Sequence, residues 1–234
     1  MKLLAFETAT EACSVAVWDD GRVLECFEVA PRRHAELALP WADAVLAEAG
    51  IARAQLDAIA VGRGPGAFTG VRLAIGLAQG IALALDRPVL PVSTLAALAL
   101  RVPADAGDIL SAIDARMGEV YTAAFRREGE GVAPLSEECV WAPDAVELPA
   151  GAQRWDAVGT GLAALDGALQ ARLQPRLGRV DAAALPHAAD VARLAALDFA
   201  DGKAVAAELI EPVYLRNNVA LTLQEQQALR AARG

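Results

Sequence analysis

Residues 57–92 read DAIAVGRGPGAFTGVRLAIGLAQGIALALDRPVLPV, and this stretch decides the fold. Its first apolar run, 58–61, predicts a short strand that leads into a loop rich in glycine and proline. Thr69 is expected to cap a helix that ends near residue 86, before Pro88. The apolar residues 89–92 predict the next strand. A strand, a loop, a helix and a second strand in this order indicate an α/β fold.

The predicted helix has two faces of different character. One face is a continuous apolar stripe that suits packing on a sheet; it consists of Val71, Ala74, Ile75, Ala78, Ala82 and Leu85. The opposite face mixes small, polar and apolar residues; it consists of Thr69, Arg72, Gly76, Gln79, Gly80 and Leu83.

Two glycines inside a helix need a compensating interaction, because each costs about 1 kcal/mol relative to alanine. Gly76 and Gly80 lie one turn apart on the outer face. Either another part of the same domain packs closely against them, or a helix of another chain does. The residues alone leave both explanations open.

The rest of the chain repeats the pattern weakly. Strands at 3–6, 13–18 and 22–29, a helix at 34–49 and the central stretch predict the order βββαβαβα. LLAFETATEACSVAV at 3–17 then matches LSAIDARMGEVYTAA at 110–124, and AVGRG at 60–64 matches AVGTG at 157–161. We interpret this as two related α/β halves that face a cleft, with chance similarity in an alanine-rich chain as the alternative.

Composition limits the class of protein. The net charge of −9 argues against a large sequence-independent grip on nucleic acid. No uninterrupted apolar run of about 18 residues occurs, so no membrane span is predicted. Three scattered cysteines suggest a reducing compartment. Cys13 and Cys26 fall on neighbouring strands of a predicted hairpin, out of register for a disulfide.

Catalytic groups are few. The glycine loop could hold a phosphate, but no lysine follows it as in a Walker A motif, and no acid follows the next strand. His34 and His187 are isolated, so a metal site is not predicted. Glu7 and Asp114 could flank the cleft, although the simpler interpretation is that each ends a strand and bonds its own turn. The candidate nucleotide contacts are Glu7, Gly64, Gly66, Asp114, Gly159 and Gly161.

Several of these segments resemble a known family. FETATEACSVAVW, RRHAELALPWADAVLAEAG, GPGAFTGVR, IDARMGEVY and the closing PVYLRNN are similar to sequences of the bacterial TsaB (YeaZ) family. The resemblance spans nearly the whole chain. It implies the actin-like ATPase fold, in which two βββαβαβα-type halves face each other and the second is abbreviated. The expected halves are 1–104, joined by the C-terminal segment 205–234, and 105–204.

The resemblance also implies a role. TsaB proteins work with TsaD and the ATPase TsaE to make N6-threonylcarbamoyladenosine beside the anticodon of tRNAs that read codons starting with A. TsaD is the catalytic subunit, and TsaB is its inactive relative and binding platform. This implies a cytoplasmic protein that pairs with TsaD, forms homodimers alone and reaches tRNA mainly through TsaD. No intrinsic cofactor is implied, with ATP or ADP as the nucleotide of the complex.

Departures from TsaD fit a non-catalytic subunit. TsaD holds a metal with a histidine pair on the helix that corresponds to 34–49, whereas Ala38 stands here where the second histidine would fall. Glu7 replaces the aspartate that is usual in TsaB relatives. The alternative function is a weak ATPase or phosphotransferase that uses Glu7, Asp114 and the glycine loops. A peptidase, as some relatives are labelled, would lack both a metal pair and a nucleophile.

In the family, the helices that correspond to 34–49 and 69–85 form the contact with TsaD. The resemblance therefore implies that the glycine face is a docking surface. The residues expected to contact the partner are Leu37, Trp41, Val45, Thr69, Arg72, Gly76, Gln79, Gly80 and Leu83.

Overall fold

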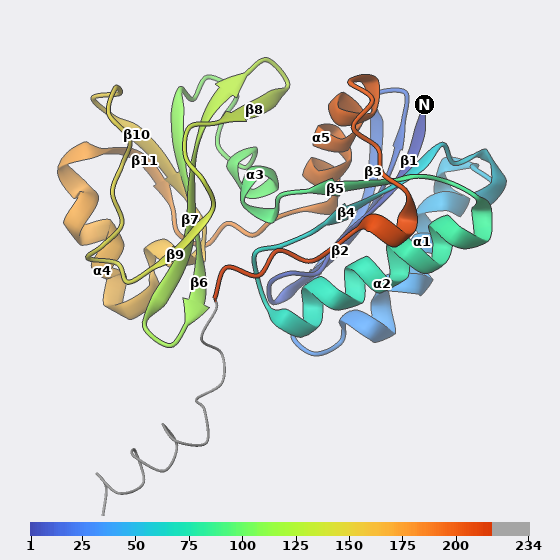
Figure 1. The fold of residues 1–234 in the computed structure, drawn as a ribbon, viewed down its shortest axis with the longest axis horizontal. Helices are drawn as coiled ribbons and strands as arrows, with labels where there is room; N and C mark the ends of the chain where they lie inside the picture. Colours follow the sequence, from blue (N-terminus) through green and yellow to red (C-terminus); the bar gives the residue numbers. More distant parts are fainter. Residues whose placement is uncertain (217–234) are drawn as a thin grey trace, which may run out of the picture.

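The computed structural model describes residues 1–216 and contains two β-sheets side by side (Figure 1). The first sheet consists of β1 Lys2–Glu7, β2 Ala12–Asp19, β3 Arg22–Val29, β4 Ala58–Gly62 and β5 Val89–Val92. The second sheet consists of β6 Asp108–Arg116, β7 Glu119–Glu128, β8 Gly131–Pro134, β9 Cys139–Trp141, β10 Trp155–Val158 and β11 Leu177–Asp181.

The two sheets share one topology. The strand order is β3-β2-β1-β4-β5 in the first, and β8-β7-β6-β10-β11 in the second, where β9 also pairs with β7. In each sheet the first three strands are antiparallel and the last two run parallel to the first. This correspondence confirms the predicted α/β class and the two related halves.

Five α-helices and four short 3-10 helices complete the described chain. The α-helices are α1 His34–Ala49, α2 Phe68–Leu85, α3 Thr94–Ala99, α4 Ala164–Leu173 and α5 Ala188–Ala200. The 3-10 helices are η1 Arg53–Gln55, η2 Thr160–Leu162, η3 Gln174–Arg176 and η4 Ala207–Leu209.

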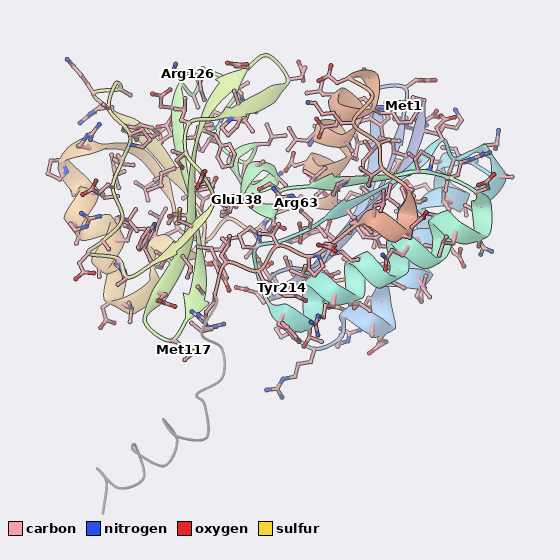
Figure 2. All side chains as sticks on the ribbon, viewed as in Figure 1. Met1, Arg63, Met117, Arg126, Glu138 and Tyr214 are labelled. Carbon is pink, nitrogen blue, oxygen red and sulfur yellow. The ribbon has the colours of Figure 1, made fainter. Side chains whose placement is uncertain are left out.

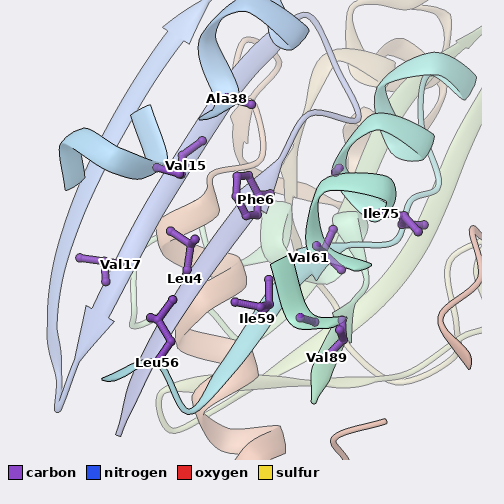
Figure 3. Packing of buried hydrophobic residues seen from close by; sticks show 14 of the residues in the cluster. Leu4, Phe6, Val15, Val17, Ala38, Leu56, Ile59, Val61, Ile75 and Val89 are labelled. Carbon is purple, nitrogen blue, oxygen red and sulfur yellow. The ribbon is translucent and has the colours of Figure 1, made fainter. Parts of the chain in front are cut away.

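Alternation along the strands directs side chains into two cores. Leu4 and Phe6 of β1 point to the face covered by α1 and α2, where they pack with residues such as Ile75 (Figure 3). Leu3 and Ala5 point to the opposite face, which α5 covers. Because helices cover both faces, β1 is buried along almost its whole length.

The predicted division of the chain needs one correction. Helix α5 was assigned to the second half, 105–204, but it packs on β1, β2, β4 and β5 of the first sheet. Its apolar residues belong to the core that contains Leu3 and Ala5. The C-terminal segment begins on the first half, where Val205 bridges to Val89 of β5. Residues 217–234 of that segment lie outside the described residues.

One local prediction about a helix differs from the structure. Helix α2 begins at Phe68, so Thr69 lies inside its first turn and caps nothing. The backbone N–H of Ala67 donates instead to the carbonyl of Ala9, 2.7 Å away, which ties the start of α2 to the β1–β2 turn. Pro40 leaves α1 as one helix from His34 to Ala49.

Helix α2 is the single described helix that is long and apolar enough to cross a membrane by length and composition. Core helices of other proteins meet the same criteria. Its inner face, including Val71, Ala74 and Ala78, packs into the core of the first half. Only 33% of the helix is buried, however, so an unusual share of apolar surface faces outward.

Candidate functional site

The outer face of α2 is open to solvent along most of its length. Leu83 is 64% exposed, which is large for a leucine. Exposed apolar side chains beside small residues are typical of a surface that binds another protein. The predicted contact residues that are exposed here are Thr69, Arg72, Gly76, Gly80 and Leu83.

The glycines of α2 divide into two kinds. A Cβ atom added to Gly76 or Gly80 would meet no atom within 4 Å. A Cβ atom added to Gly70 would lie 1.9 Å from the carbonyl oxygen of Thr8, so close packing explains that glycine. No described part of this chain packs against Gly76 or Gly80. Of the two explanations left open by the sequence, packing within the domain is therefore excluded for the described residues.

Gln79 and Arg72 of this face make contacts inside the chain. The side-chain amide of Gln79 is half-buried and donates to the carbonyls of Ala207 and Ile210, at 3.0 and 3.5 Å. The guanidinium of Arg72 lies 3.7 Å from the centre of the Phe68 ring and donates to the hydroxyl of Tyr214. Both side chains thus hold the C-terminal segment against α2.

Helix α1 supplies less of the surface than predicted. Val45 is 1% exposed and lies in the core with Ala38, so the prediction that it contacts a partner is wrong. Helical spacing places Val45 seven residues after Ala38, on the buried stripe. Leu37 and Trp41 are half-buried against the same core. Leu39, which the sequence analysis did not single out, is 48% exposed.

A cleft of about 680 Å³ lies between the two halves. Its walls come from the β1–β2 turn, the start of α2, the β6–β7 turn and residues 213–216. Among the predicted nucleotide contacts, Gly66 and Asp114 line this cleft. Glu7, Gly64, Gly159 and Gly161 do not line it, so the structure brings together only two of the six predicted contacts.

Glu7 is sealed inside the protein. Its side chain is 1% exposed and accepts hydrogen bonds from Ala9 N at 2.7 Å and Thr94 Oγ1 at 2.9 Å. Burial raises the pKa of Glu7 to about 7, although these hydrogen bonds favour the ionised form. A Cβ atom on Gly62 would lie 2.0 Å from the Glu7 carboxylate. The proposed contact of Glu7 with a nucleotide is therefore wrong for this conformation.

Asp114 bonds its own turn. Its Oδ1 accepts from the backbone N–H of Arg116 at 2.8 Å, and Oδ2 pairs with the Arg116 guanidinium at 2.8 Å. Glu7 bonds Ala9 in the same i to i+2 manner. The simpler interpretation of both acids is thus confirmed.

Three other predicted glycines have a packing reason. Added Cβ atoms would lie 3.3 Å from Val71 at Gly64, 2.2 Å from the Ala112 carbonyl at Gly159 and 2.9 Å from the Ala112 backbone at Gly161. They allow close approach of neighbouring elements, and none of them lines the cleft.

No metal site is formed by the described residues. No group of three histidine, cysteine, aspartate or glutamate side chains is close enough there to hold an ion. Nε2 of His34 donates to the carbonyls of Thr10 and Ala12, at 3.1 and 3.2 Å. Ala38, where a second histidine would be needed, is fully buried. His34 is therefore a structural donor that holds the β1–β2 turn.

The C-terminal segment contributes residues 213–216 to the cleft, which was not predicted from the sequence. Val213 N donates to the carbonyl of Arg63 at 3.0 Å, and Tyr214 packs on Phe68 with 5.7 Å between ring centres. Arg216 then reaches Glu119 of the second half, with its Nε 3.0 Å from Oε2. Figure 2 shows Tyr214 between the halves, beside the start of α2. A short extended run such as this carries no periodic signal.

Comparisons with known proteins agree with this arrangement. A family model described as "TsaD: tRNA N6-adenosine threonylcarbamoyltransferase" matches residues 28–223. The chain is 46% identical to the tRNA threonylcarbamoyladenosine biosynthesis protein TsaB of Escherichia coli, over 94% of this chain and 96% of the relative. It is 38% identical to TsaB of Haemophilus influenzae, over 94% and 95% of the two chains.

Two solved structures from Pseudomonas aeruginosa have the same fold. One, an uncharacterized protein described as similar to the peptidase YEAZ, has a TM-score of 0.84 and 47% identity. The other, YeaZ, has a TM-score of 0.82 and 45% identity. Each comparison covers 92% of this chain and 99% of the solved one.

Proposed function

This chain belongs to the TsaB family, and from this premise we propose that it is a non-catalytic partner of TsaD in the synthesis of threonylcarbamoyladenosine in tRNA. TsaD would perform the chemistry, with the ATPase TsaE as the third protein. The three free cysteines suit the reducing cytoplasm.

The observation that carries this proposal is the open glycine face of α2. Gly76 and Gly80 leave space where side chains would stand, and exposed Leu83 lies one turn beyond them. A partner helix could approach closely here, and its packing would offset the helix propensity that two glycines lose. In the absence of TsaD, a second copy of this chain would use the same face.

The test is co-purification with TsaD. Gly76→Arg and Gly80→Arg each place a long side chain where the partner would lie, and we expect each to abolish pairing while the monomer stays folded. Gly107→Arg is the matched control, because Gly107 also has open space around a Cβ position but lies outside α2. Pairing that survives both α2 substitutions would contradict the proposal.

A weak ATPase or phosphotransferase remains the alternative, supported by the cleft between the halves. Burial of Glu7 and the pairing of Asp114 with Arg116 speak against it, since neither acid is free to hold a magnesium-bound phosphate. Magnesium-dependent ATP turnover by the isolated chain, lost in Asp114→Asn, would favour this alternative. Turnover at background would end it.

A further inference from the structure

Three flat side chains gather at the mouth of the cleft. Phe68 is 55% exposed and Tyr214 is 48% exposed, and their rings lie 5.7 Å apart at 34°. The Arg72 guanidinium is 3.7 Å from the Phe68 centre and 5.4 Å from the Tyr214 centre. The hydroxyl of Tyr214 accepts a hydrogen bond from Arg72. These contacts hold the three planes in place before any ligand arrives, which lowers the entropic cost of binding.

Arginines slightly outnumber acids in the cleft, which is lined by Arg32, Arg116 and Arg216 and by Glu11 and Asp114. The contacts of Arg72 within the described chain are with the two rings and the hydroxyl, and not with an acid. Arg32 also lines the cleft, is exposed and forms no ion pair with a described residue. Arg116 pairs with Asp114, yet its side chain is 80% exposed. Two exposed arginines, Arg32 and Arg116, thus line the cleft, and a third, Arg72, lies beside it on the Phe68 ring.

We propose that this cleft mouth binds an unpaired base of single-stranded RNA. Unstacked bases of RNA pack on aromatic rings and on guanidinium planes, and arginines neutralise the phosphates on either side. The base would stack on the Phe68–Arg72–Tyr214 cluster. The neighbouring phosphates would lie near Arg32 and Arg116, which stand on different halves of the protein.

RNA explains this cluster better than a protein partner does. Phe68 and Tyr214 of the cluster line the cleft, while Arg72 joins them from the adjacent face of α2, and the cleft is large enough for a nucleotide. The proposal rests on the proposed function, because tRNA modification is what would bring RNA to this chain. It adds a direct RNA contact to a protein whose net charge suggested that TsaD supplies most of them.

The experiment measures binding of a fluorescein-labelled single-stranded RNA of about eight nucleotides to the full chain by fluorescence anisotropy. Phe68→Ala and Tyr214→Ala should each weaken binding roughly tenfold through lost stacking. Tyr214→Phe keeps the ring and should retain most of the affinity. Trp141→Ala is the matched control, because Trp141 is an exposed aromatic residue that does not line this cleft.

The salt dependence of RNA binding tests the contribution of the arginines. Arg32→Glu should weaken RNA binding. It should also reduce the slope of log affinity against log salt concentration by the amount expected for the loss of about one phosphate contact. Arg154→Glu makes the same charge change on an exposed residue outside the cleft and should leave the salt dependence unchanged.

Three outcomes would overturn the proposal. The first is RNA affinity that is equal in the wild type, Phe68→Ala and Tyr214→Ala. The second is complete competition by free ATP at similar affinity, which would indicate a nucleotide site. The third is loss of TsaD pairing in these variants with RNA affinity intact, which would indicate a protein contact. RNA binding is measured without TsaD, whereas docking is tested by co-purification of Gly76→Arg with TsaD. The two proposals can therefore fail independently.

Discussion

At the residue scale, Glu7 shows how burial can remove a candidate site. The sequence places this acid at the end of a strand beside a predicted cleft, as a nucleotide contact would require. The structure instead encloses its carboxylate between the end of β4 and the start of α3, where Thr94 and Ala9 donate to it. Gly62 is needed for this arrangement, because a Cβ atom there would overlap the carboxylate. The Glu7 carboxylate thus serves the packing of the first half.

Glu7 makes the stability of the protein depend on pH. Burial raises its pKa from 4.5 to about 7, so between these values the folded protein binds more protons than the unfolded chain. The free energy of unfolding should therefore fall as pH rises from 4.5 to 7 and stay level above that. A shift of this size corresponds to about 3 kcal/mol.

Glu7→Gln tests this prediction by urea unfolding at several pH values. The variant stays neutral, so it should lose the slope between pH 4.5 and 7 and be more stable than the wild type at pH 8. An equal slope in both proteins would show that Glu7 is not the titrating group.

At the element scale, α2 combines three surfaces on one helix. Its apolar stripe packs on the first sheet, Gly70 lets the β1–β2 turn approach, and Gly76 and Gly80 face solvent. Gly70 is a glycine because the Thr8 carbonyl leaves no room for a Cβ atom. At Gly76 and Gly80 the described residues 1–216 give no packing reason for a glycine, which directs attention to a partner.

Alanine substitutions should separate these two uses of glycine. Gly70→Ala forces a Cβ atom against the Thr8 carbonyl and should destabilise the protein by about 1–3 kcal/mol. Gly76→Ala adds a methyl group in open space and should stabilise the monomer by up to about 1 kcal/mol. Thermal or urea unfolding measures both. A destabilised Gly76→Ala monomer would reveal internal packing that the structure does not contain.

At the scale of the whole molecule, the C-terminal segment connects the halves. It enters the first half at Val205, adds Ala207 and Ile210 to that core, and reaches Glu119 of the second half through Arg216. A second ion pair, between Arg63 and Glu138 at 2.9 Å, also joins the halves (Figure 2). Since Val213 bonds the backbone of Arg63, the segment and this ion pair form one connected support.

Two neighbouring residues test whether this segment stabilises the fold. Ile210 is 4% exposed and Leu209 is 68% exposed. Ile210→Ala should lower the free energy of unfolding by about 2–5 kcal/mol through lost burial. Leu209→Ala, one residue earlier, should change it by no more than about 0.5 kcal/mol. Urea unfolding compares them, and similar small effects would mean that the segment is not part of the core.

Much of the fold could be predicted from local pattern. The three opening strands, α1, α2 and the β6–β7 hairpin lie where apolar periodicity and turn residues placed them. The prediction that Cys13 is out of register with Cys26 is also confirmed, because Val15 lies opposite Cys26. In the second half, helix α4 contains a non-helical stretch at 165–167.

The site was predicted less completely, because its composition depends on burial and long-range contacts. The order of elements, their two-fold repetition and the outward glycine face of α2 follow from the sequence alone, since periodicity and backbone propensity act between near neighbours. Only the tertiary structure decided that Val45 and Glu7 are inside, that α5 belongs to the first half, and that Tyr214 meets Phe68. These contacts join residues far apart in sequence, so no local pattern encodes them.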